Sequence, residues 1–208
     1  MKLKSFFPKK RFGQHWLINQ NVLDKIINNS DLNKDDFVLE IGPGKGALTK
    51  RLLDTEIKGL HAVELDRDLI EFLRDRFSKV AKFSIQQDDI LSIDLRNFDY
   101  KFNKVIANIP YNITGPILEM FLGGLGKRPK YNLEKLVFLM QKEVADRIIA
   151  KEGSSNNSAL STRIKLISNV EKICDIPPSS FNPPPKVHSS LVIFNPLPTQ
   201  SRLDMKTE

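Results

Sequence analysis

The sequence predicts a Rossmann-like α/β fold with a mostly parallel central sheet flanked by helices. Short apolar segments with strand character alternate with segments whose apolar residues recur at helical spacing. Such alternation implies βαβ units with right-handed crossovers. A glycine-rich turn, Gly42-Pro43-Gly44-Lys45-Gly46, follows the first strand of this series, where a doubly wound sheet binds a nucleotide.

The elements follow one another at the short intervals that βαβ units require. Expected strands cover residues 37–41, 60–64, 83–87, 104–107, 135–140 and 187–194. Expected helices cover residues 21–29, 47–53, 67–77, 115–122, 142–151 and 158–168. No internal repeat is apparent, and 208 residues suffice for one α/β domain with a buried core.

Composition narrows the class of partner and excludes some kinds of site. The net charge is +7, and the basic residues cluster at Lys2, Lys4, Lys9, Lys10 and Arg11, and again at Lys127, Arg128 and Lys130. Clusters of this kind usually meet phosphate backbones or other anionic surfaces. The single cysteine, Cys174, excludes an internal disulfide, and the scattered histidines show no metal-ligand spacing, so we expect no metal. Without an apolar leader or a long apolar run, the sequence predicts a cytoplasmic protein.

The glycine-rich turn is a weak signal alone, and Glu64 strengthens it. Glycines let the backbone approach a ligand closely, but the spacing is neither that of a dinucleotide fingerprint nor that of a Walker A loop. Glu64 lies about 20 residues further on, at the end of the next strand, where a carboxylate can accept hydrogen bonds from both ribose hydroxyls. Gly42 and Glu64 are therefore candidate cofactor ligands.

A second candidate carboxylate follows the strand at 83–87. Asp88 can accept a hydrogen bond from the amino group of a cofactor adenine, and Asp89 could do the same, so spacing alone does not separate them. These features predict a cofactor that carries a nucleoside. Both NAD and S-adenosylmethionine fit at this point.

The tetrapeptide Asn108-Ile109-Pro110-Tyr111 decides between the two cofactors. An adenine amine is a poor nucleophile, so a site that methylates it must hold the amine with acceptors and aim its lone pair. The Asn108 carbonyl and a backbone carbonyl at Ile109 or Pro110 can accept both N–H bonds, and Tyr111 offers a ring on which an extruded base can stack. Positioning and dipoles would supply the rate enhancement without a strong base. The tetrapeptide predicts methyl transfer from S-adenosylmethionine to N6 of adenine.

At these residues the chain resembles the rRNA adenine N6,N6-dimethyltransferase family, the KsgA-like enzymes that modify two adjacent adenosines near the 3′ end of small-subunit rRNA. The resemblance runs in order from residue 9 to about residue 195. Its blocks are residues 9–17, 39–44, 63–66, 86–88, 108–113, 141–144 and 177–187.

The resemblance implies roles that spacing could not assign. His15 and Leu17 would contact the cofactor, together with Gly42, Glu64, Asp88 and Asn108, and Asp88 is favoured over Asp89. Phe181, which prolines bracket on both sides, would stack on the target adenine opposite Tyr111. The catalytic set is therefore expected to be Asn108, Pro110, Tyr111 and Phe181. The basic N-terminus would face RNA.

The chain departs from the family pattern in two places. Thr114-Gly115-Pro116 stands where the family usually has Ser-Thr-Pro or a similar run, and the family's C-terminal helical domain is not expected within 208 residues. We expect a basic arm at 1–20 that contributes to the cofactor site, a catalytic domain at 21–196 and a polar tail at 197–208. Loss of that helical region would put RNA affinity and full dimethylation at risk.

The expected function is dimethylation of small-subunit rRNA within an immature ribosomal subunit, by a monomer that binds no membrane. One alternative is the antibiotic-resistance class that methylates a large-subunit rRNA adenine. A second is a catalytically weak rRNA-binding assembly factor. The block 177–187 and Gln141-Lys142-Glu143-Val144 look more like the small-subunit enzymes.

Overall fold

The structure, a computed structural model, describes residues 6–9, 12–98, 101–124, 129–151, 158–198 and 201. Its strands are β1 (Trp16–Leu17), β2 (Phe37–Ile41), β3 (Gly59–Glu64), β4 (Phe83–Gln87), β5 (Lys104–Asn108), β6 (Lys135–Gln141), β7 (Ser168–Ile176), β8 (Phe181–Asn182) and β9 (Ser189–Pro196). Its α-helices are α1 (Gln20–Asn28), α2 (Ala47–Leu53), α3 (Arg67–Arg76), α4 (Thr114–Leu122), α5 (Lys142–Ile149) and α6 (Ala159–Ile167).

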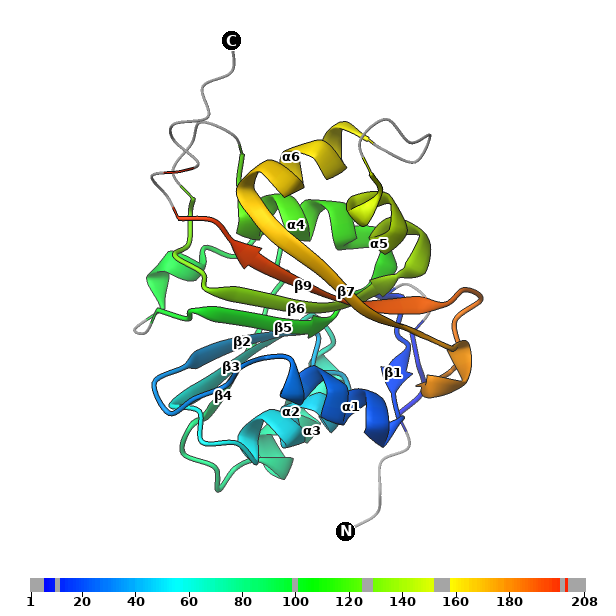
Figure 1. Ribbon diagram of the computed structural model, residues 1–208. Helices are drawn as coiled ribbons and strands as arrows, with labels where there is room; N and C mark the ends of the chain where they lie inside the picture. The colour runs from blue at the N-terminus through cyan, green and yellow to red at the C-terminus, as the bar shows by residue number, and fades with distance from the viewer. Residues whose placement is uncertain are drawn as a thin grey trace.

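Seven of these strands form one sheet in the order β4-β3-β2-β5-β6-β9-β7. The first five of these strands run parallel, and β9 pairs antiparallel with both β6 and β7. Figure 1 shows α1, α2 and α3 on one face of the sheet and α4, α5 and α6 on the other. The predicted α/β fold with a mostly parallel sheet is confirmed.

Helices cover both faces of the sheet, so alternate residues of a central strand enter two different cores. Leu39 and Val105 pack into the apolar cluster on the side of α4, α5 and α6. Val38 and Ile106 pack into the cluster on the side of α1 and α2. Strands buried on both faces are apolar throughout, and this made their positions readable from sequence. In the part of the chain that the structure describes, no helix is long and apolar enough to cross a membrane.

The structure adds three strands that the sequence analysis missed. The edge strand β7 carries charged residues along an only partly buried stretch, so it lacks the apolar pattern of a central strand. The other two, β1 and β8, have two residues each and pair antiparallel, with Trp16 opposite Asn182 and Leu17 opposite Phe181. A pairing this short and this distant in sequence leaves no periodic signal. The last predicted strand begins at Ser189 rather than at residue 187.

A buried ion pair joins β2 and β5 at their amino ends. Lys104 Nζ lies 2.8 Å from Asp36 Oδ2, and Asn103 donates to the other oxygen of Asp36 at 2.8 Å. The main-chain N–H of Phe37 in turn donates to the Asn103 side chain. Burial disfavours the Asp36 charge, but the hydrogen bonds from Lys104 and Asn103 outweigh it, so the pKa of Asp36 lies below its ordinary value. These contacts hold β2 and β5 in register, and so align their carboxyl ends.

We expect Lys104→Met to lower the free energy of unfolding by about 3–5 kcal/mol, because it leaves Asp36 buried and unpaired. Lys135→Met is the matched control. Lys135 pairs with Asp31, whose side chain is 71% exposed, so the loss should be about 1 kcal/mol or less. Urea denaturation of both variants tests this. Equal losses would show that the Asp36–Lys104 pair has no special role.

Candidate active site

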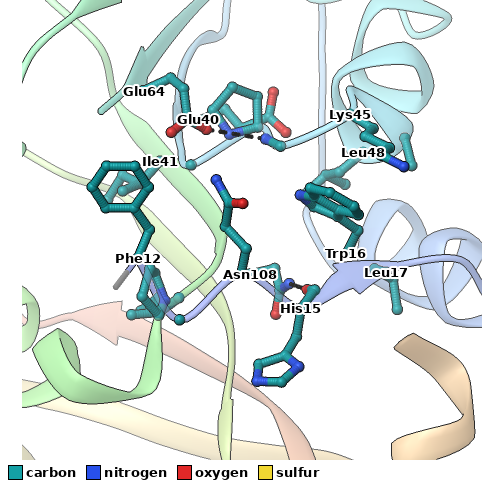
Figure 2. Close-up of a pocket in the computed structure, with 18 of the residues that line it drawn as sticks. Phe12, His15, Trp16, Leu17, Glu40, Ile41, Lys45, Leu48, Glu64 and Asn108 are labelled. Carbon is teal, nitrogen blue, oxygen red and sulfur yellow. Dashed lines mark hydrogen bonds between the residues drawn. The ribbon is translucent and has the colours of Figure 1, made fainter. Parts of the chain in front are cut away.

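A cavity of about 770 Å³ lies where the carboxyl ends of β2, β3, β4 and β5 meet the segment that contains β1. This is the edge at which open parallel sheets bind ligands, and the volume suits a nucleoside-bearing cofactor. Figure 2 shows labelled side chains reaching the cavity from β1, β2, β3 and β5. Of the residues expected from sequence, His15, Leu17, Gly42, Glu64, Asp88, Asn108, Pro110 and Tyr111 line it.

The glycine-rich turn bends sharply back from β2 into α2. Gly42, Gly44 and Gly46 all have positive φ, and Gly42 N donates to Val63 O at 2.9 Å. A Cβ on Gly44 would lie 2.7 Å from the Trp16 ring. The turn therefore needs glycine at Gly44 both for its conformation and for the approach of Trp16.

Glu64 links the turn to the end of β3. One oxygen of its carboxylate accepts from the main-chain N–H groups of Leu65 and Asp66 at 2.9 Å each, and the other accepts from Gly44 N at 3.3 Å. Burial raises the pKa of Glu64 in spite of these bonds. A carboxylate has about four lone-pair sites, so acceptor capacity remains for a ligand hydroxyl.

The end of β4 brings Asp88 and Asp89 to the cavity together. Asp88 N donates to Glu64 O at 3.1 Å, and the Asp88 carboxylate accepts from Gln86 and from Asp89 N. The Asp89 carboxylate accepts from Leu91 N, within its own turn. Asp88 is the more buried of the two, whereas Asp89 is exposed and used locally. This difference agrees with the preference for Asp88 but does not test it.

Two leucines beside these carboxylates also line the cavity, although the sequence did not lead us to expect them there. Leu65 and Leu91 are 47% and 40% exposed, and both line the cavity. Exposed apolar side chains next to hydrogen-bonding groups suit a flat base, whose faces are apolar and whose edge is polar. Their position in the sequence could have identified them, because each leucine lies within two residues of a carboxylate at a strand end.

Asn108, at the end of β5, is oriented by the segment that contains β1. Its Nδ2 donates to the main-chain oxygen of His15 at 2.8 Å. A carbonyl oxygen can only accept, so the amide nitrogen must face His15 and the amide oxygen must face away from it. That oxygen has no partner within the described residues, and Asn108 lines the cavity. An uncommitted acceptor is therefore available there.

The imidazole of His15 contacts Pro183 and Tyr111. Its Nδ1 lies 2.8 Å from the main-chain oxygen of Pro183, and its ring stacks on Tyr111 with a centroid distance of 6.0 Å. Tyr111 in turn shares a hydrogen bond of 2.7 Å with Ser189 Oγ. Burial raises the pKa of the Tyr111 hydroxyl, so it stays neutral. These contacts hold the Tyr111 ring at the wall of the cavity.

The expected stacking role of Phe181 disagrees with this conformation. Phe181 is 2% exposed and packs in the apolar cluster with Leu17 and Ile26. It does not line the cavity, although its neighbour Asn182 does. The reason is the pairing of β8 with β1, which places Phe181 opposite Leu17.

The N-terminal segment is held by ion pairs that the sequence analysis assigned differently. The Lys9 ammonium lies 2.5 Å from Asp66 and 2.7 Å from Asp68, and Gln14 also donates to Asp66. Lys9 was expected to face RNA, but in this structure it binds carboxylates of its own chain. Lys2, Lys4, Lys10 and Arg11 of the N-terminus expected to face RNA lie outside the described residues. So do Lys127 and Arg128 of the second basic cluster, and residues 199–200 and 202–208 of the tail.

Two buried polar groups at the cavity also escaped the sequence analysis. Glu40 is 1% exposed, and burial raises its pKa from 4.5 to about 8. Trp16 packs on the glycine turn, and its indole nitrogen has no hydrogen-bond partner in the described part of the chain. A glutamate in a strand or a tryptophan near the N-terminus does not by itself indicate a binding site. Only the packing of β1 against the turn brings Trp16 there.

Comparisons with known proteins agree on one family. A family model described as ribosomal RNA adenine dimethylase matches residues 6–207. Ribosomal RNA small subunit methyltransferase A of Prochlorococcus marinus (strain MIT 9312) is 61% identical over 208 residues, which cover all of this chain and 75% of that protein.

Solved structures share the fold. A dimethyladenosine transferase from Plasmodium falciparum superposes with a TM-score of 0.78 and 35% identity, covering 88% of this chain and 64% of that one. The 23S rRNA methyltransferase ErmE gives a TM-score of 0.76 and 25% identity, covering 88% and 70% of the two chains.

The raised pKa of Glu40 predicts a pH-dependent stability. A carboxyl whose pKa rises from 4.5 to about 8 on folding contributes stability that is full below pH 4.5 and is lost as the pH climbs through 8. Glutamine resembles the protonated carboxyl and has no such proton to lose. We expect the Tm of Glu40→Gln, relative to the unmutated chain, to rise steadily between pH 5 and pH 9. Glu56→Gln, at an exposed position, is the control, and parallel profiles for Glu40→Gln and the unmutated chain would refute the prediction.

The burial of Phe181 predicts that it stabilises the fold. We expect Phe181→Ala to lower the free energy of unfolding by about 3–5 kcal/mol, because it opens a cavity in the core. Phe7→Ala should change it little, since Phe7 is 78% exposed. Chemical denaturation measures both. An unchanged stability together with slowed turnover would instead support the stacking role.

Proposed function

Because this chain belongs to the ribosomal RNA adenine dimethylase family, we propose that it methylates N6 of two adjacent adenosines near the 3′ end of small-subunit rRNA. S-adenosylmethionine supplies the methyl group, as an electrophilic carbon on a sulfonium. Two transfers to each adenosine give the dimethylated base.

The residues of the cavity fit this cofactor. Glu64 retains acceptor capacity for ribose hydroxyls, and Asp88 offers a carboxylate to an adenine amine. Leu65 and Leu91 offer apolar surface for the base. Gly42, His15 and Leu17 complete the wall beside the glycine turn.

The observation that carries the proposal is the orientation of Asn108. Its amide oxygen is left without a partner among the described residues because the nitrogen donates to His15 O. An oxygen in this position can accept one N–H of the target amine, and a main-chain carbonyl of Ile109 or Pro110 can accept the other. Holding both N–H bonds in this way directs the nitrogen lone pair toward the methyl group.

The aromatic wall completes the target subsite. Tyr111 is held between His15 and Ser189, so its ring is fixed before the base arrives. An adenosine taken out of its stack can lie against this ring. The nitrogen becomes positively charged as the methyl group is transferred, and it then loses a proton readily, so water can accept that proton. No strongly basic side chain is required.

Sequence identity favours rRNA of the small subunit. The matching relative at 61% identity is named for that subunit, whereas the large-subunit enzyme ErmE is 25% identical. We place the substrate within an immature subunit in the cytoplasm, where subunits assemble. A monomer suffices, since one chain contributes every residue named above.

The test is methyl transfer from labelled cofactor to immature small subunits and to both free rRNAs, mapped by primer extension. We expect Asn108→Ala to lower turnover by about 10²- to 10³-fold, because one acceptor for the amine is lost. Cofactor binding, measured by calorimetry, should persist or weaken only modestly. Asn195→Ala, on β9 and outside the cavity, should leave turnover unchanged.

Two outcomes would contradict the proposal. Methyl groups found only on large-subunit RNA would support the antibiotic-resistance class. Cofactor binding without transfer to any RNA would support an assembly factor. This chain spans 75% of the length of its curated relative, so the assay should include a version extended by that relative's remaining C-terminal region.

A further inference from the structure

One end of the cavity has no assigned ligand group in the function proposed above. It is formed by Trp16, Lys45 and Leu48, beside the glycine turn, and Figure 2 shows these three side chains together on one side of the cavity. Glu64 lies at a distance from them in the same view. A cofactor bound at Glu64 and Asn108 has one part left to place, its amino-acid end.

The order of the strands sets the direction in which the cofactor would lie. Asp88 follows β4, Glu64 ends β3, the glycine turn follows β2, and Asn108 ends β5. These strands are neighbours in the order β4-β3-β2-β5. With adenine at Asp88 and ribose at Glu64, the sulfonium must reach Asn108, and the amino-acid end is left beside the turn after β2.

Lys45 lies in this region with its charge uncommitted. Its Nζ is 4.0 Å from the centroid of the Trp16 ring, and its main-chain oxygen accepts from Arg76 at 2.6 Å. The ring holds the ammonium by a cation–π contact without neutralising it. No carboxylate pairs with Lys45 in the parts of the chain that the structure describes.

Two of the three other cations that line the cavity differ from Lys45 in this respect. Lys50 lies 2.8 Å from Asp54, and Arg51 lies 3.2 Å from Asp24. Both charges are therefore already compensated. Arg76, the third of these cations, has no described counter-ion either, but its guanidinium lies over the Phe72 and Phe77 rings and donates to the main-chain oxygen of Lys45. Lys45 is the cation whose charged group lies on Trp16 at this end of the cavity without a described counter-ion.

We propose that the Lys45 ammonium, positioned on the face of Trp16, binds the carboxylate of the amino-acid end of S-adenosylmethionine. The inference rests on the proposed function for the identity of the cofactor. An ammonium–carboxylate pair forms strong charge-assisted hydrogen bonds, and a lysine already held against an aromatic ring loses less freedom on binding. The buried indole nitrogen of Trp16, which has no described acceptor, provides a second donor for a carboxylate oxygen after a small shift.

Three ligands separate the parts of the cofactor in a binding experiment. S-adenosylhomocysteine has the whole amino-acid end, decarboxylated S-adenosylmethionine lacks the carboxylate, and 5′-methylthioadenosine lacks the amino-acid end altogether. Trp16 is the only tryptophan of the chain, so its fluorescence reports binding at this place. Calorimetry gives the same dissociation constants independently.

We expect Lys45→Met to weaken S-adenosylhomocysteine roughly tenfold and to change methylthioadenosine and the decarboxylated ligand by less than about twofold. Lys45→Arg keeps the charge and should restore most of the affinity. Lys50→Met is the matched control, since Lys50 lines the same cavity and pairs with Asp54, and it should leave all three affinities unchanged.

An unchanged affinity for S-adenosylhomocysteine in Lys45→Met would overturn the proposal. So would an equal loss for all three ligands, because that pattern indicates a general distortion of the cavity. If the unmutated chain bound none of the three ligands, the proposed function itself would fail. Failure of each proposal thus has its own signature.

Discussion

The amide of Asn108 presents its oxygen to the cavity while its nitrogen donates to the main-chain carbonyl of His15. This hydrogen bond joins β5 to a segment about 90 residues away, and several other contacts exist to hold that segment in place. Lys9 and Gln14 bind Asp66 on one side of the cavity. The pairing of β1 with β8 holds the segment on the other side. Both anchors hold the segment whose His15 carbonyl orients the amide.

The same segment connects the two halves of the site. Trp16 packs on the glycine turn, which belongs to the half of the sheet that suits a cofactor. His15 contacts Pro183 and Tyr111, which belong to the half that suits a target base. A shift of this segment would therefore alter the binding surface of both halves together. The same segment also buries Phe181, because the short pairing of β1 with β8 places Leu17 opposite the phenylalanine.

Buried charged groups have different partners at the amino ends and at the carboxyl ends of the strands. At the amino edge, Asp36 is buried with a cation and a full set of hydrogen bonds, so its pKa is lowered. At the carboxyl edge, Glu40 and Glu64 are buried without a cationic partner among the described residues, and burial raises both pKa values. The first arrangement is typical of a structural pair. The second arrangement leaves carboxyl groups at the cavity without a cationic partner, and a ligand that supplies a partner would stabilise them.

Sequence alone determined the elements whose signal is local. The strands at 37–41 and 83–87 were predicted with their observed bounds. The other predicted strands and helices near the cavity differ from the observed ones by one or two residues at most, whereas the short strand β1 was missed. Glu64, Asp88 and Asn108 could be found because a parallel sheet places the ends of its strands at one edge, so position along the chain implies position in space. Family resemblance then identified the chemistry.

Only the tertiary structure decided which side chains from distant segments share a surface. Trp16 meets Gly44, Lys45 rests on Trp16, and Phe181 turns into the core instead of the cavity because β1 pairs with β8. The charged edge strand β7 is a strand because β9 supplies its hydrogen-bonding partner. Composition and periodicity carry no information on such contacts, because they arise from the packing of segments that are far apart in the chain.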